Sequence, residues 1–143
     1  MSDLSPVTVV VAVRASTERA WEAFTNPTSI QQWNFASADW HCPQARNDLR
    51  SGGAFSYRME ARDGSFGFDF EGAYLEVSPP TRLLYSLGPE REVLVEFARD
   101  GEQTRVSQTF TPESTHPVEQ QRAGWQAILD NYKAHVESAA PES

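Results

Sequence analysis

The sequence predicts an α+β domain in which a curved antiparallel β-sheet wraps around a long C-terminal α-helix, with two short helices after the first strand. Three observations predict it: a β-branched run near the N-terminus, about sixty residues of apolar and polar alternation between turn residues, and a last segment with helical periodicity. Such a sheet and one amphipathic helix bury their apolar faces best against each other. We expect a single domain over residues 1–143, with a structured core at about 7–137.

The N-terminal third predicts one strand and two helices. Val7–Val13 reads VTVVVAV, a run typical of a strand. Ser16 is a suitable N-cap for the first helix, and Asn26-Pro27 both ends that helix and starts a second, shorter one. The apolar faces of the two helices are expected at Ala20, Trp21 and Phe24, and at Ile30 and Trp33.

The central part predicts antiparallel strands after a loop through Trp40 and Pro43. The turns between strands are expected at Ser51-Gly52-Gly53, Asp63-Gly64, Pro79-Pro80 and Asp100-Gly101. The alternation puts on one face Phe55, Tyr57, Met59, Phe66, Phe68, Phe70, Ala73, Leu75, Val77, Leu83, Tyr85, Leu87, Val93, Val95, Phe97, Val106, Gln108 and Phe110.

Two further features concern the ends of this region. The alternation changes parity between Phe70 and Ala73, which predicts a β-bulge at Gly72 that bends the sheet. From Pro117 the apolar spacing becomes three, four and seven, which predicts a helix of about five turns. We expect the tail from Ser138 to Ser143 to be frayed.

Composition excludes several classes of function. The 143 residues carry a net charge of −8 without a basic cluster, so nucleic acid and anionic membrane surfaces are not expected partners. No apolar run is long enough to span a membrane, and no signal peptide is recognisable, so a cytoplasmic location is expected. The sequence also lacks metal, nucleotide and serine-hydrolase motifs, and we expect no cofactor and no metal.

Several ordered motifs resemble those of one protein family. Arg19-Ala-Trp-Glu-Ala-Phe-Thr-Asn-Pro followed by Trp33, Asp48-Leu-Arg-Ser-Gly-Gly, the segment from Gly72 to Leu83, and Gly124-Trp125 with Leu129 resemble the AHSA1-like (activator of Hsp90 ATPase homologue 1-like) branch of the SRPBCC, START or Bet v 1-like helix-grip superfamily. The resemblance implies a cavity between the long helix and the sheet. Members of the superfamily bind lipids, hormones or polyketides, some catalyse reactions, and a few assist the chaperone Hsp90, so the resemblance names no ligand.

The expected cavity wall combines predicted inward residues with the loop after the short helices. Its residues are Trp33, Trp40, Phe55, Tyr57, Met59, Phe68, Phe70, Tyr85, Val95, Phe97, Gln108, Phe110, Trp125, Leu129 and Tyr132. His41 is a candidate polar group at one end, or else a solvated loop side chain. Gln108 on an apolar face needs a hydrogen-bond partner, either in the protein or in a ligand. No residue is assigned as catalytic.

Three functions are compatible with these observations. The first is a carrier or sensor that binds an apolar small molecule. The second is an enzyme of the cyclase, hydratase or hydrolase type, in which His41, Gln108 or an inward Asp69 would orient a hydrophobic substrate. Alternation places Asp69 outward, and only a register shift would turn it inward. The third is an Hsp90-activator-like module with a chaperone partner. The absence of clustered acid and base groups favours the first function.

Overall fold

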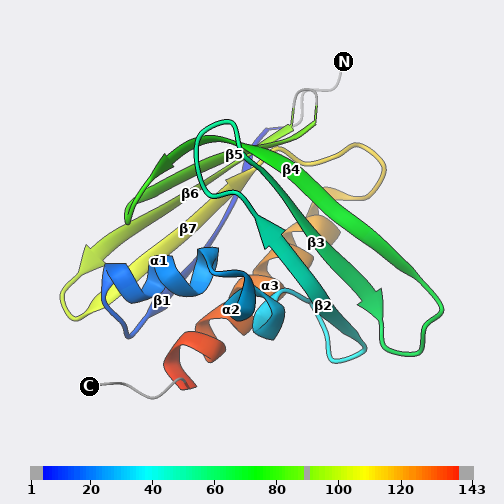
Figure 1. The fold of residues 1–143 in the computed structure, drawn as a ribbon, viewed down its shortest axis with the longest axis horizontal. Coiled ribbons are helices and arrows are strands. Elements are labelled where there is room, and N and C mark those ends of the chain that lie inside the picture. The colour runs from blue at the N-terminus through cyan, green and yellow to red at the C-terminus, as the bar shows by residue number, and fades with distance from the viewer. Residues whose placement is uncertain (1–4, 89–90, 139–143) are drawn as a thin grey trace.

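The computed structural model describes residues 5–88 and 91–138. The elements are β1 (Val7–Val13), α1 (Thr17–Thr25), α2 (Pro27–Trp33), β2 (Trp40–Asn47), β3 (Ala54–Ala61), β4 (Gly67–Ser78), β5 (Arg82–Gly88), β6 (Arg91–Asp100), β7 (Gln103–Phe110) and α3 (Val118–Ser138). The strands form one antiparallel sheet in the order β1-β7-β6-β5-β4-β3-β2. Figure 1 shows this sheet curled over the helices. The predicted fold class is therefore confirmed. Among the described residues, none of the helices has the length and apolar character of a membrane-spanning segment.

The two short helices form as the caps predict. The Ser16 hydroxyl accepts a hydrogen bond from the Arg19 backbone amide at 3.1 Å, which satisfies one of the free N–H groups of the first turn of α1. Asn26 ends α1 through its backbone N–H and starts α2 through its side chain, which accepts from the Thr28 amide at 2.9 Å. Because one residue performs both functions, α1 and α2 follow each other without a loop. Their predicted apolar faces are buried.

The segment predicted as a loop through Trp40 and Pro43 is instead the edge strand β2, so that prediction is wrong. Its pairing with β3 shifts register between His41 and Gln44, around Cys42 and Pro43. Proline has no N–H to donate to a ladder and occurs in strands at edges and bulges. The local sequence WHCPQARN also lacks the regular apolar alternation by which strands are recognised.

The parity change in β4 is real, but its predicted position at Gly72 is wrong. The ladder with β3 runs through Gly72 without interruption, and the register shift lies between Tyr74 and Glu76 in the pairing with β5. Tyr74 therefore points inward with 2% exposure, and Leu75 points outward with 46% exposure. Gly72 has another function. A Cβ there would lie 2.6 Å from the ring of Phe55 on the paired strand, so only glycine allows that ring to cover the strand.

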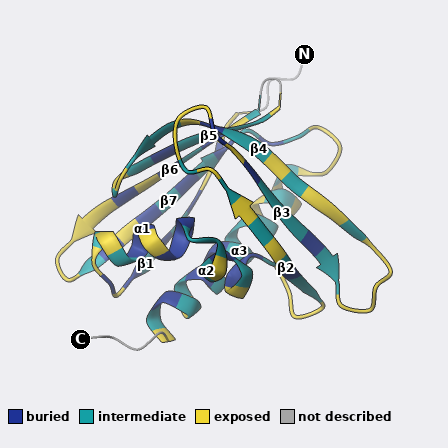
Figure 2. Ribbon diagram, viewed as in Figure 1, coloured by how far each residue is buried: buried dark blue, intermediate teal, exposed yellow. Residues whose placement is uncertain are grey.

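The C-terminal helix holds the other two helices against the sheet. Its buried residues are Leu129, Tyr132 and Val136, and its 21 residues make it about one turn longer than predicted. The Tyr132 hydroxyl donates to the Ala20 carbonyl of α1 at 2.6 Å, and Lys133 Nζ donates to the Ala12 carbonyl of β1 at 2.7 Å. Figure 2 shows buried residues of α3 along the helix among half-buried and exposed ones. The predicted frayed tail, beyond Ser138, lies outside the described residues.

Candidate functional site

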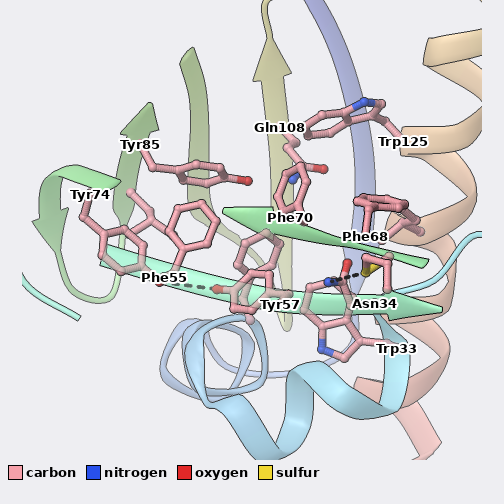
Figure 3. A pocket seen from close by; sticks show the side chains of 14 residues that line it. Trp33, Asn34, Phe55, Tyr57, Phe68, Phe70, Tyr74, Tyr85, Gln108 and Trp125 are labelled. Carbon is pink, nitrogen blue, oxygen red and sulfur yellow. Dashed lines mark hydrogen bonds between the residues drawn. The ribbon is translucent and has the colours of Figure 1, made fainter. Parts of the chain in front are cut away.

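A pocket of about 190 Å³ lies between the inner side of the sheet and the three helices, as Figure 3 shows from close by. Side chains from α1, α2, β3, β4, β5, β7 and α3 form its wall. The wall residues are Phe24, Trp33, Asn34, Phe55, Tyr57, Met59, Phe68, Phe70, Tyr74, Leu83, Tyr85, Gln108, Trp125 and Ile128. The wall is mostly aromatic, and the described residues contribute no Asp, Glu, Lys, Arg or His side chain to it.

The structure brings most of the residues predicted for a cavity wall into this one place. Those that line the pocket are Trp33, Phe55, Tyr57, Met59, Phe68, Phe70, Tyr85, Gln108 and Trp125. Those predicted for the wall that do not line it are Trp40, Val95, Phe97, Phe110, Leu129 and Tyr132, and the candidate polar group His41 does not line it either.

Packing by the helices explains why Phe97, Tyr132 and Phe110 are not on the wall. Phe97 lies 5.4 Å from Trp21 and 5.6 Å from Phe24 between ring centroids, and Phe24 lies 5.2 Å from Tyr132. Aromatic rings at these separations are in contact and leave no open space between them. Phe110 is covered by the ring of Trp125, which stacks on it at 4.2 Å. The inner side of β6 and the end of β7 are therefore packed core.

Five wall residues were not among those predicted for the cavity. Phe24 and Ile128 belong to helical faces that were predicted as apolar, and Leu83 belongs to the predicted inner face of its strand, so their periodicity was available as a signal. Tyr74 was missed because the parity change was placed at Gly72, before Tyr74, whereas the register shift follows Tyr74. Asn34 is the C-cap of α2, and nothing in the sequence distinguishes it from any polar residue that ends a helix.

Gln108 is the most informative polar residue on the wall. It is 7% exposed, it lines the pocket, and it points inward between Val106 and Phe110 with the Tyr85 hydroxyl as its neighbouring polar group. In Figure 3 the Tyr85 hydroxyl points toward it. Burial raises the pKa of Tyr85, and the nearby Gln108 amide offsets part of that rise. Both groups therefore face the pocket as neutral hydrogen-bonding groups.

The hydroxyl of Tyr57 is already engaged in a hydrogen-bond network. It lies 3.3 Å from the Tyr74 hydroxyl, which also accepts from Asn47 Nδ2 at 3.1 Å. Asn47 in turn donates to the Thr25 carbonyl at the end of α1, at 2.7 Å. Burial raises the pKa of both tyrosines. Because these groups satisfy one another, this network ties the open side of the sheet to α1, and Tyr57 presents mainly its ring to the pocket.

Asn34 is the second buried amide of the wall, with 9% exposure. Its Nδ2 donates to the sulfur of Met59 at 3.4 Å, drawn as a dashed line in Figure 3. The Cys42 thiol lies beside the same amide; burial raises the pKa of this thiol, and the amide offsets part of the rise. Sulfur is a weak hydrogen-bond partner, so the Asn34 amide is poorly satisfied by the protein.

The charged candidates lie outside the pocket. His41 Nε2 is 3.6 Å from a carboxylate oxygen of Glu60, and Asp69 pairs with Arg58 at 3.4 Å with its side chain half exposed. These residues occupy the outer face of β2, β3 and β4, as alternation predicts for Asp69. Within the described part of the chain, the pocket wall thus carries hydrogen-bonding groups but no charged acid or base.

The rim of the pocket carries exposed aromatic rings. Phe68 is both a wall residue and 42% exposed, and Phe66 is 62% exposed. The Trp40 ring centroid lies 5.9 Å from that of Phe66 and 6.1 Å from that of Phe68. We refer to Trp40, Phe66 and Phe68 as the aromatic rim.

Comparison with known proteins identifies relatives of this chain. Residues 14–137 match the family described as activator of Hsp90 ATPase homolog 1-like protein (AHSA1). An AHSA1-like protein from Aeromonas hydrophila has 44% identity and a TM-score of 0.89, with 94% of each chain covered. The protein Chr148 from Cytophaga hutchinsonii has 42% identity and a TM-score of 0.79, covering 92% of this chain and 91% of the other.

A third solved structure shares the fold at lower identity. Protein CV1439 from Chromobacterium violaceum has 24% identity and a TM-score of 0.85, covering 96% of this chain and 99% of the other. Among proteins with curated functions, none matches this chain.

Proposed function

This chain belongs to the AHSA1 family, and from that premise we propose that it binds a neutral, mainly aromatic small molecule in the pocket between the sheet and α3, as a carrier or sensor. The observation that carries the proposal is the pocket itself. Among the described residues it has a mainly aromatic wall, no charged side chain, and the buried Gln108 amide beside the Tyr85 hydroxyl. One hydroxyl cannot satisfy both the N–H donors and the oxygen of an amide, and each buried group left unsatisfied costs free energy. A ligand or a water molecule in the pocket removes that cost.

The wall favours a neutral ligand over a charged one. Moving an ionised group from water into an apolar site costs several kcal/mol unless an opposite charge receives it. The described wall offers none, and burial keeps Tyr85 in its neutral form by raising its pKa. A hydroxyl or carbonyl group on the ligand, in contrast, finds Gln108 and the Tyr85 hydroxyl as donors and acceptors.

The volume limits the size of the ligand. A dry protein cavity of about 150 Å³ accommodates benzene, so a pocket of about 190 Å³ is suited to one or two fused rings. Many drug-sized ligands need about 300 Å³ or more. The proposed ligand is therefore smaller than the lipids bound by other helix-grip proteins, unless it extends past Phe68 onto the aromatic rim.

Three probes of equal ring size test this proposal: naphthalene, 2-naphthol and 2-naphthoate. We expect 2-naphthol to raise the melting temperature most, by about 10 °C at one hundred times its Kd, because binding only the native state then adds about 2.7 kcal/mol. Naphthalene should bind more weakly, and 2-naphthoate should not bind. The Gln108→Leu variant should lose about fivefold in 2-naphthol affinity, which corresponds to one hydrogen bond.

The matched control is Gln120→Leu, the same change at an exposed position of the first turn of α3. It should leave binding unchanged. The proposal is wrong if none of the three probes raises the melting temperature and native mass spectrometry of the freshly purified protein detects no retained small molecule. Preferential binding of 2-naphthoate would contradict the neutral ligand class in particular.

We favour binding over catalysis because the polar residues suggested for a reaction are not together. His41 and Asp69 lie on the outer face, while Gln108 lies on the pocket wall. Gln108 has no proton to give or take near neutral pH, so it orients a ligand rather than serving as an acid or base.

A second candidate function is an Hsp90-activator-like interaction, which the family description and the aromatic rim together support. Clustered exposed aromatic rings are typical of surfaces that bind other molecules. If this function holds, the protein should stimulate the ATPase rate of a purified Hsp90, and Phe66→Ser should reduce that stimulation without lowering the melting temperature. An unchanged ATPase rate at saturating protein would exclude it.

A further inference from the structure

We propose that Asn34 forms a second polar subsite, so that the ligand is a flat, neutral, fused-ring molecule with hydrogen-bonding groups at two separate positions. This inference rests on the proposed function, because it concerns the same pocket. It adds a second position at which the protein can hydrogen-bond the ligand, and it therefore narrows the chemical class of the ligand.

The burial of Asn34 carries the first step. The residue is 9% exposed and lies on the pocket wall. Its side-chain partners among the described residues are two sulfurs: its amide nitrogen donates to the Met59 sulfur at 3.4 Å, and the Cys42 thiol lies beside the same amide. A thioether is a weak acceptor, and an unsatisfied buried amide oxygen costs free energy. A polar group of a ligand would satisfy both halves of this amide.

Helix capping does not explain the residue. Asn34 ends α2 through its backbone, whose N–H donates to the Ile30 carbonyl at 3.0 Å. Any residue with a backbone N–H makes this bond, and the backbone of Asn34 has φ −82°, which does not require asparagine. The side-chain amide is therefore free for another role, and it is directed toward Met59 on the pocket wall.

The position relative to Gln108 carries the second step. Asn34 lies against Met59 of β3, and Gln108 belongs to β7, with β4, β5 and β6 between these two strands. The two amides therefore reach the pocket wall from different parts of the curled sheet and not from neighbouring strands. Figure 3 shows the rings of Phe68 and Phe70 in the region between them. One hydroxyl or carbonyl group cannot serve both amides, whereas a fused-ring ligand with two such groups can.

The test compares 2-naphthol with 2,6-dihydroxynaphthalene on the full-length protein by isothermal titration calorimetry. We expect the second hydroxyl to increase affinity about fivefold, the equivalent of one net hydrogen bond. Asn34→Leu should remove that gain and leave the affinity for 2-naphthol within twofold of the wild type. Gln108→Leu should lower the affinity for both ligands by about the same factor.

The control variant is Gln120→Leu, which replaces an amide with leucine at an exposed position outside the pocket. It should keep the preference for 2,6-dihydroxynaphthalene, and thermal melting of each variant checks that it is folded. The second subsite is wrong if Asn34→Leu changes the affinity for the two ligands by the same factor, or if wild-type protein binds them equally. In either case binding of 2-naphthol would still support the proposed function, whereas absence of binding of both ligands would count against the proposed function itself.

Discussion

Two parts of the sheet differ in what lies against their inner side. The covered half, formed by β1, β7 and β6, meets α1 and α3, and Val95 and Phe97 are at most 3% exposed. The open arm, formed by β2, β3 and β4, meets mainly α2 at β2, and its inner side borders the pocket. Tyr57 and Phe70 there are only half buried, and Phe68 is 42% exposed. Figure 2 shows the same contrast along the strands.

This difference shows that the same alternating pattern serves two purposes. In the covered half it builds packed core, where each inward side chain contributes to stability through contacts on all sides. In the open arm it builds a wall, where inward side chains have contacts on one side and face the pocket on the other. Stability should therefore depend mostly on the covered half, and binding on the open arm and β5.

The largest expected effect is the cost of removing an aromatic ring from the covered half. Phe97→Ala should lower the free energy of unfolding by about 3 to 5 kcal/mol, because the rings of Trp21 and Phe24 that contact Phe97 cannot close the space. Phe70→Ala in the open arm should cost less than about 2 kcal/mol, since Phe70 already borders a cavity. Equilibrium urea unfolding measures both. Equal losses would mean that the two parts are equally packed.

Two substitutions that introduce a larger side chain at neighbouring positions sharpen the comparison. Leu83 on β5 and Val95 on β6 are cross-strand partners, but Leu83 lines the pocket and Val95 does not. Val95→Phe should destabilise the protein by about 1 to 3 kcal/mol through overpacking. Leu83→Phe should cost less than about 1 kcal/mol, because the ring has room, and should weaken 2-naphthol binding at least tenfold. If Val95→Phe blocks binding and Leu83→Phe does not, the pocket lies elsewhere.

Removing one tyrosine hydroxyl on each side compares the contribution of hydrogen bonds to stability. Tyr132 packs beneath the covered half, and Tyr57 lies in the open arm. Tyr132→Phe leaves the buried Ala20 carbonyl without its 2.6 Å donor and should cost about 1 to 3 kcal/mol. Tyr57→Phe should cost about 0.5 to 1 kcal/mol, because the Tyr74 hydroxyl keeps its bond from Asn47. Thermal unfolding followed by circular dichroism distinguishes them. A larger loss for Tyr57→Phe would show that the open arm depends on its hydroxyl network.

The smallest expected effect on a native interaction concerns Glu137 on α3, which pairs with Lys133 on the same helix and with Arg14 just after β1. Glu137 accepts hydrogen bonds from Lys133 Nζ and from the Arg14 amide, each at 2.9 Å, and its pKa is lowered, chiefly by the bond from Lys133. A lowered folded-state pKa adds stability above the unfolded value of about 4.3, and this stability is lost as the pH falls through the folded-state pKa. Glu137→Gln should therefore cost about 0.2 to 1 kcal/mol at pH 7 and nothing at pH 2.

Asp69→Asn provides the control for that prediction in the open arm. Its pairing with Arg58 at 3.4 Å is exposed, so its loss should change the free energy of unfolding by less than about 0.3 kcal/mol. Urea unfolding at pH 7 and pH 2 measures both variants. A Glu137→Gln difference that persists at pH 2 would indicate lost packing rather than lost charge.

The sequence by itself determined most elements and the family. The β-branched run of β1, the double cap at Asn26, the turns at Gly52, Gly64 and Gly101, and the period of α3 are local signals, because each depends on residues within a few positions of one another. The motifs indicated the family that residues 14–137 match. Local signals failed at Cys42-Pro43 and near Leu75, where β2 and β4 change register against neighbouring strands.

Only the tertiary structure decided which inward residues are core and which border the pocket. Alternation places Val95, Phe97 and Leu83 on the same face, but Phe97 meets the rings of α1 and Leu83 meets open space. It also decided that Asn34, an ordinary helix end in the sequence, brings a buried amide to the pocket wall. The physical reason is that burial depends on how far the helices extend over the curled sheet, and residues distant in the chain set that coverage together.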